Sequence, residues 1–138
     1  MGRILAIDYG RKRAGIAVTD ELQIIATGLA TVASHELLSY LKEYTTREKI
    51  DLIVVGEPKD MMNRPSEASR FIEPFVKKLQ AAFPHLEIKR FDERFTSKMA
   101  HQAMLDGGLK KKKRQDKALV DTLSATLILQ SYMESIKF

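Results

Sequence analysis

The chain of 138 residues contains no cysteine and no tryptophan, and it has only three histidines. Without cysteine it has no disulfide, no thiolate metal ligand and no cysteine nucleophile. The histidines are scattered along the chain, and we interpret them as surface residues rather than as metal ligands: His35, His85 and His101. A metal site in this protein would therefore depend on oxygen ligands.

Long apolar runs are also missing. No stretch approaches the roughly 20 residues that span a bilayer, so we expect no membrane partner. The early apolar run is interrupted by Asp8 and by the basic residues at 11–13, which argues against a signal peptide. These absences favour a cytoplasmic protein.

The composition is typical of a single globular domain covering residues 1–138. Hydrophobic residues make up 44% of the chain and charged residues 30%, and this length suits one domain with a sizeable core. The net charge is +5, and part of the excess lies in the run KKKKR at 110–114. Such a cluster indicates a polyanionic partner. A solvated loop that keeps the protein soluble would have the same composition.

The apolar pattern predicts five strands and four helices in the order βββαβαβαα. The predicted strands cover residues 4–8, 15–19, 24–31, 50–56 and 86–91. The predicted helices begin with Ser34 as a cap, at Pro65, at Thr96 or Ser97, and after Asp116 as a cap. Pro74 lies inside the second helix, where we expect a kink or a restart because proline removes a backbone donor. Gly107 and Gly108 end the third helix.

This order of elements implies a mixed sheet. The first three strands are separated by tight connections, so we expect an antiparallel meander. The helices between the later strands imply crossovers and parallel pairing. The predicted fold is therefore α/β, with a five-stranded mixed sheet covered by helices on both faces.

Three acidic positions stand out by where they lie. Asp8 ends the first predicted strand, and Asp92 and Glu93 follow the last one. Asp121 lies in the second turn of the last helix, among small residues. Each is weak evidence alone, since an aspartate at a strand end or near a helix start commonly has a local structural role. Together they suggest a site, because open α/β sheets bind ligands at the carboxyl ends of their strands.

Carboxylates gathered at one edge would repel one another unless a cation lay between them. Hard oxygen ligands without cysteine or clustered histidine indicate Mg²⁺ or Mn²⁺ as the cofactor. Such ions generate hydroxide and stabilise the leaving oxygen of a phosphodiester. We also expect Gly10 to adopt a positive φ, so that the basic residues at 11–13 stay near this edge.

Four segments resemble the YqgF (RuvX-like) family of nucleases with a ribonuclease H-like fold, in the family's order and over nearly the whole chain. They are AIDYGRKRAGIAVTD at 6–20, VVGEP at 54–58, DERFTSKMA at 92–100 and KALVDTLSATLILQSYM at 117–133. The family is described as Holliday junction resolvases and as ribosomal RNA precursor-processing nucleases. The resemblance implies a catalytic and metal-binding site at Asp8, Glu93 and Asp121.

One segment departs from the family pattern. Where the family usually has Gly-Leu-Pro, this chain has Gly56-Glu57-Pro58. Glu57 either joins the metal site or is solvated, and we favour the solvated position. Strand parity read from the sequence leaves open whether Asp92 or Glu93 points into the site, and only the resemblance favours Glu93. Tyr9 either stacks on a base or packs in the core.

Basic residues near the predicted site form the candidate nucleic-acid interface: Arg11, Lys12, Arg13, Arg94, Lys110, Lys111, Lys112, Lys113 and Arg114. Arg94 contacts either a phosphate or a neighbouring carboxylate. The favoured function is a metal-dependent endonuclease acting on ribosomal RNA precursor or on Holliday junction-like DNA. The alternative is a nucleic-acid-binding module without catalysis. Both a monomer and a homodimer are compatible with the sequence.

Overall fold

The computed structural model describes residues 2–57, 69–92 and 117–136. Within these ranges five strands and three longer helices are present, together with one short 3₁₀ helix. In chain order they are β1 (Arg3–Tyr9), β2 (Arg13–Thr19), β3 (Ala26–Ala33), η1 (Ser34–Glu36), α1 (Leu37–Arg47), β4 (Ile50–Glu57), α2 (Ser69–Ala82), β5 (Glu87–Asp92) and α5 (Lys117–Ser135).

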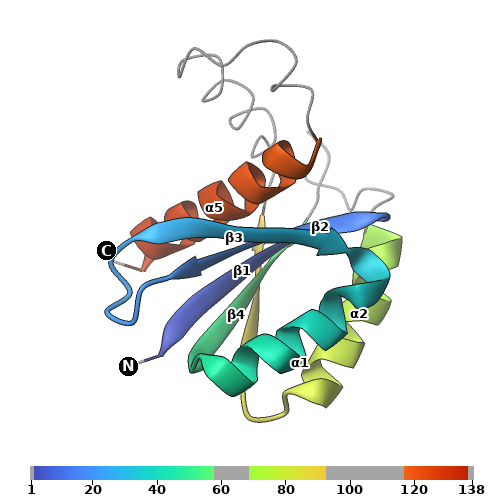
Figure 1. The fold of residues 1–138 in the computed structure, drawn as a ribbon, viewed down its shortest axis with the longest axis horizontal. Coiled ribbons are helices and arrows are strands. Elements are labelled where there is room, and N and C mark those ends of the chain that lie inside the picture. The colour runs from blue at the N-terminus through green and yellow to red at the C-terminus, as the bar shows by residue number, and fades with distance from the viewer. Residues whose placement is uncertain (1, 58–68, 93–116, 137–138) are drawn as a thin grey trace.

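The strands form one mixed sheet in the order β3-β2-β1-β4-β5 (Figure 1). β1, β2 and β3 pair antiparallel, as the short connections predicted, whereas β4 pairs parallel to both β1 and β5. The carboxyl ends of β1, β4 and β5 therefore lie at the same edge of the sheet. The predicted α/β fold with a mixed five-stranded sheet is confirmed.

Helices cover both faces of the sheet (Figure 1). On one face, alternate residues of the central strands pack against α1 and α2. On the other face, the intervening residues of these strands pack against α5. This division follows from the two-residue period of a strand. The same period decides whether a given side chain of β1 or β5 lies on the α1/α2 face or on the α5 face.

One local prediction about the helices is wrong, and of the two outcomes predicted at Pro74, a kink or a restart, the restart is excluded. Ser34 is the first residue of η1, and α1 has Glu36 at its N-cap with no side-chain capping bond. The Ser34 hydroxyl instead donates a hydrogen bond to the carbonyl oxygen of Gly10, at 2.6 Å. α2 contains Pro74 and runs without a break from Ser69 to Ala82, so no restart occurs there. The predicted third helix, its Gly107-Gly108 end and the starts at Pro65 and Asp116 lie outside the described residues.

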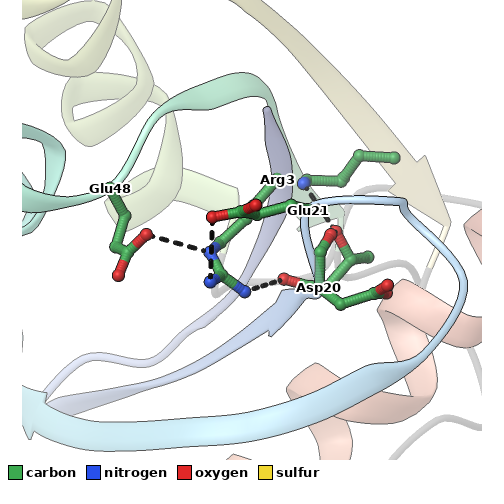
Figure 2. A network of polar contacts seen from close by, with 6 residues as sticks. Arg3, Asp20, Glu21 and Glu48 are labelled. Atoms are coloured by element: carbon green, nitrogen blue, oxygen red, sulfur yellow. Dashed lines mark hydrogen bonds and ion pairs between the residues drawn. The ribbon is translucent and has the colours of Figure 1, made fainter. Parts of the chain in front are cut away.

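A polar network closes the amino-terminal edge of the sheet, at the opposite end of β1 from Asp8 (Figure 2). The Arg3 guanidinium donates to the Thr19 carbonyl oxygen at 2.9 Å and pairs with Glu48 at 3.3 Å. Glu21 lies 3.9 Å from the same guanidinium. The buried Thr19 hydroxyl accepts a hydrogen bond from the Ile4 amide at 2.9 Å, which satisfies that amide beside a register shift between β1 and β4. The network is structural and lies away from the carboxyl edge.

None of the described helices is long and apolar enough to cross a bilayer.

Candidate active site

Asp8 lies on the α5 face of the sheet. Along β1, Ile4 and Ala6 pack with the α5 core, whereas Leu5 and Ile7 pack with α1 and α2. Strand alternation therefore directs Asp8 toward α5. The Asp8 side chain is half-buried at the carboxyl end of β1, which is where the sequence predicted it.

A row of paired residues connects Asp8 to the beginning of α5. Asp8 is opposite Gly15 on β2, and Gly15 is opposite Thr31 on β3. Directly paired residues in antiparallel strands share a face, so Thr31 also faces α5. The hydroxyls of Thr31 and Thr122 form a hydrogen bond of 2.5 Å. Thr31 lies two strands, or about 10 Å, from Asp8 along this row. Asp121 is the residue before Thr122, so its backbone is held near the β3 end of the row.

Gly28 makes this approach of α5 to β3 possible. A Cβ atom built on Gly28 would collide with the Cγ2 methyl of Thr122. The absence of a side chain on β3 therefore lets the first turns of α5 lie close to the sheet. This contact fixes the height of α5 above the edge that carries Asp8.

The alternation of side chains along β5 decides on which face of the sheet Asp92 lies. Phe91 contacts Tyr132 of α5 edge to face, and Lys89 lies over the same ring. On the opposite face, Ile88 packs with the α1/α2 core and Arg90 pairs with Glu73 of α2 at 2.8 Å. Asp92 has the parity of Ile88 and Arg90, so it lies on the α2 face, opposite to that of Asp8.

Glu57 also lies on the α2 face. It is paired in register with Asp92 and shares the parity of Ile53 and Val55, which pack with α1 and α2. Its carboxylate is 3.9 Å from the Arg90 guanidinium, and its side chain is 33% exposed. Glu57 is thus ion-paired rather than fully solvated, and it does not share the face of Asp8.

The turn after β1 is held by hydrogen bonds that the sequence did not reveal. The Gly10 amide donates to the Arg13 carbonyl oxygen, and the Ser34 amide donates to the Lys12 carbonyl oxygen, both at 3.0 Å. Together with the bond from the Ser34 hydroxyl to Gly10, these contacts fix the turn against the start of η1. Arg11 and Lys12 are exposed at its tip, and Arg13 is half-buried.

The predicted positive φ of Gly10 is wrong, because its φ lies outside the left-handed range. Glycine is required for a different reason. A Cβ atom at this position would lie 2.6 Å from the Arg13 carbonyl oxygen, the same oxygen that accepts the Gly10 amide. The tightness of the turn, rather than its handedness, excludes a side chain.

Tyr9 packs in the core. Its ring stacks on Phe75 of α2, with centroids 4.5 Å apart and planes 13° from parallel. Burial raises the pKa of the Tyr9 hydroxyl above its ordinary value, so the hydroxyl stays protonated at neutral pH. Of the two roles open from the sequence, packing is the one that the structure shows.

Comparison with known proteins assigns the family. A family described as "RuvX: Holliday junction resolvase" matches residues 2–135. The chain belongs to the RuvX family. A "Putative pre-16S rRNA nuclease" of Phocaeicola vulgatus is 60% identical over 138 residues, which cover 100% of this chain and 99% of that protein. A protein of Flavobacterium psychrophilum with the same description is 58% identical over 133 residues, 96% of this chain and 97% of its own length.

Solved structures with low sequence identity have the same fold. The structure described as "T. thermophilus RuvC in complex with Holliday junction substrate" matches with a TM-score of 0.58 and 16% identity, covering 99% of this chain and 96% of its own. A fowlpox virus resolvase, in a complex with Holliday junction DNA, matches with a TM-score of 0.56 and 14% identity, covering 97% and 98%. The predicted ribonuclease H-like fold is confirmed by these matches.

Several residues of the predicted RuvX-family site lie outside the described residues, namely Glu93, Arg94, Lys110, Lys111, Lys112, Lys113 and Arg114. For Asp121 the structure describes the backbone alone. Within residues 2–57, 69–92 and 117–136, no three His, Cys, Asp or Glu side chains gather as metal ligands. The described donor, Asp8, offers the carboxylate oxygens that Mg²⁺ and Mn²⁺ prefer. A magnesium-type site fits this chemistry, and its full ligand set stays a prediction.

Proposed function

We propose that this RuvX-family chain is a divalent-metal-dependent nuclease that hydrolyses phosphodiester bonds in structured nucleic acid. The observation that carries the proposal is the position of Asp8, half-buried on the α5 face at the carboxyl edge of β1. Ribosomal RNA precursor is the favoured substrate, since a relative that is 60% identical is described as a "Putative pre-16S rRNA nuclease". Such processing would take place in the cytoplasm. Holliday junction-like DNA is the second candidate substrate, from the description of the family.

In this proposal Asp8, Glu93 and Asp121 together hold Mg²⁺ or Mn²⁺. The bound ion would lower the pKa of a coordinated water and offset charge on the phosphate. Two contacts support this proposal: strand alternation directs Asp8 of β1 toward α5, and the bond between Thr31 and Thr122 holds the beginning of α5 on the same face of the sheet. Asp92 has the α2-face parity of β5, so Glu93 would be directed toward the α5 face if the alternation continued by one residue.

The basic residues supply the electrostatic part of substrate binding. Arg11 and Lys12 are exposed at a turn that begins two residues after Asp8. Their position favours contact with phosphates that flank the bond at Asp8, because cations near a backbone attract it irrespective of sequence. Ser34 keeps this turn in place through its two hydrogen bonds.

A cleavage assay on labelled single-stranded RNA, duplex DNA and four-way junctions tests this proposal. Each substrate is incubated with Mg²⁺, with Mn²⁺ and with a chelator, using the parent protein and the Asp8→Asn variant in parallel. We expect cleavage only with metal and only by the parent. Metal-independent cleavage, or equal cleavage by Asp8→Asn, would refute the proposed site.

The same proteins distinguish a nuclease from a binding module without catalysis. A ligand that binds the folded state alone raises its stability by mass action. We therefore expect Mg²⁺ or Mn²⁺ to raise the melting temperature of the parent and to have a smaller effect on Asp8→Asn. Binding of nucleic acid without cleavage and without stabilisation by either metal would favour the module.

A further inference from the structure

A pocket opens on the α1/α2 face of the sheet, at the same end of β1 as Asp8. It has a volume of about 380 Å³, and the residues that line it include Tyr9, Arg11, Ser34, His35, Phe75 and Lys78. They come from the end of β1, the following turn, η1 and α2. None of the described residues that line it is acidic. The pocket therefore combines converging basic groups with an aromatic wall.

The chemistry of this lining suits a phosphate. Arg11 and Lys78 are exposed cations, and the exposed His35 ring lines the same pocket. The Glu36 carboxylate lies 3.8 Å from the His35 ring and is also exposed to solvent. The stacked rings of Tyr9 and Phe75 form the wall on the side of the sheet. Positively charged hydrogen-bond donors beside an apolar wall favour a ligand that has an anionic group and an uncharged remainder, as a nucleotide does.

The pocket and the proposed active site lie back to back across one strand. Asp8 and Tyr9 are consecutive on β1 and face α5 and α2 respectively. Arg11 lines the pocket and belongs to the turn that joins this edge to β2. A nucleic-acid strand that crosses the carboxyl end of β1 would thus contact both sides of the edge within a short length of backbone.

We infer that this pocket binds a backbone phosphate of the nucleic-acid substrate at a distance from the bond that is cleaved. It fixes the position of the strand on the enzyme, and so selects which phosphate reaches Asp8. This inference rests on the proposed nuclease function. It adds a substrate subsite on the opposite face of the sheet from Asp8.

Two consecutive lysines provide a matched test. Lys77 and Lys78 are both exposed on α2, and only Lys78 lines the pocket. We compare Lys78→Gln with Lys77→Gln, each in a protein that also carries Asp8→Asn to prevent cleavage. Binding of fluorescein-labelled single-stranded RNA is measured by anisotropy over a series of salt concentrations. The two substitutions remove the same charge from the same helix, so non-specific electrostatics affect both equally.

Loss of one phosphate contact on a single strand should lower the log–log salt slope by about 0.7, which corresponds to roughly fivefold weaker binding at 0.1 M salt. We expect this change for Lys78→Gln and none for Lys77→Gln. In proteins that retain Asp8, Lys78→Gln should raise KM for the cleaved substrate and leave kcat close to that of the parent, because Lys78 does not touch the reacting bond. Equal slopes for the two variants would overturn the inference.

The ring resonances of His35 identify the source of the phosphate. They are followed by NMR during titration with inorganic phosphate, uridine monophosphate and a short oligonucleotide. We expect the oligonucleotide to shift them at a much lower concentration than either small anion. If uridine monophosphate shifted these resonances at a lower concentration than the oligonucleotide, and the oligonucleotide did not displace it, the pocket would bind a free nucleotide. That result would overturn the inference. Failure of the nuclease proposal is distinct, because it would appear as absent cleavage by the parent protein while the Lys78 effect on binding persisted.

Discussion

Asp8 and Tyr9 are adjacent in the sequence and contribute to opposite faces of the sheet. Tyr9 stacks on Phe75 and joins the end of β1 to α2. Asp8 pairs with Gly15, so no side chain stands on β2 directly beside it on the α5 face. The packing of Tyr9 thus restrains the backbone that carries Asp8. If Asp8 binds a cation as proposed, a carboxylate held in this way needs little reorganisation beforehand, which is the arrangement that favours electrostatic catalysis.

Asp8→Asn should abolish metal-dependent cleavage and preserve the fold. The amide has nearly the shape of the carboxylate, so packing survives, whereas the charge that binds the cation is lost. We expect a fall in kcat of at least about a hundredfold, with a melting temperature in chelator equal to or slightly above that of the parent. Asp121→Asn should behave alike, and the double variant should be little worse than either single one, because the ligands act as a unit. Additive losses would show that the two residues act independently.

Two neighbouring carboxylates test the alternation of β5. Glu93→Gln should abolish cleavage, whereas Asp92→Asn should retain most of it, because Asp92 lies on the α2 face with Arg90. Cleavage rates and melting temperatures are measured for both variants. The opposite ranking would mean that the strand changes its alternation at its end and that Asp92 is the ligand.

At the scale of elements, the turn between β1 and β2 depends on contacts with the beginning of η1. Gly10→Val should destabilise the protein by about 1–3 kcal/mol, because a side chain there would press on the Arg13 carbonyl oxygen. Ser34→Ala should cost about 1 kcal/mol through loss of its hydroxyl bond to Gly10. It should also raise KM, since the turn that carries Arg11 is less well held. Denaturant unfolding and cleavage kinetics measure the two effects, and a Gly10→Val protein as stable as the parent would refute the close contact.

The stabilisation that Asp20 gives to the turn between β2 and β3 should depend on pH. Backbone amides of Ile25 and Ile24 donate to the Asp20 carboxylate and hold its pKa below the ordinary value. Because the folded-state pKa is the lower one, the stabilisation is present at neutral pH and is lost as the pH falls through that pKa. We expect Asp20→Ala to lower the melting temperature at pH 7 and to differ less from the parent near pH 3. Asp20→Asn retains an acceptor oxygen, so its melting temperature at pH 7 should fall less than that of Asp20→Ala. If the difference in melting temperature between Asp20→Ala and the parent grew on acidification, this account would be contradicted.

These elements also show what the sequence could and could not predict. All five strands and the buried faces of α1 and α2 followed from apolar spacing, because burial on a sheet or helix has a regular period. The buried face of α5 was predicted less well, since residues such as Ala125, Leu129 and Tyr132 pack against the sheet whereas Leu123 and Leu127 are only half-buried. The role of Ser34 was predicted wrongly, since it depends on a contact with Gly10, 24 residues away. The role of Gly10 was predicted wrongly because it depends on the close approach of the Arg13 carbonyl oxygen within the turn, which the sequence does not show. The same holds for the pairing of Glu57 with Arg90, which joins two strands. The face of Asp92 required the observed contacts of β5, and the metal ligands as a set stay a prediction.

Across the whole molecule, the two edges of the sheet differ in chemistry. At the amino-terminal edge, charges are paired within the protein, as in the contacts of Arg3 with Glu48 and Glu21. At the carboxyl edge, Arg90 is also paired, with Glu57 and Glu73, but the side chains of Arg11 and Lys12 in the turn after Asp8 are exposed to solvent, and Arg11 also lines the pocket. Long-range attraction of a polyanion is therefore directed toward the edge where the cleavage is proposed. The net charge of +5 alone would not give this direction.

A comparison of two triple lysine variants tests whether position or total charge controls binding. One variant changes Lys110, Lys111 and Lys112 to serine, and the other changes Lys42, Lys49 and Lys77, which are exposed elsewhere. Both remove three positive charges. If the run at 110–114 follows a phosphate backbone, the first variant should lower the log–log salt slope by about 0.7 per contact on single strands or about 0.9 on duplex DNA, and the second should leave it nearly unchanged. Melting temperatures verify that both variants are folded. Equal slopes in the two variants would show that the run only keeps the protein soluble, and the interface would then be limited to the turn at 11–13 and its surroundings.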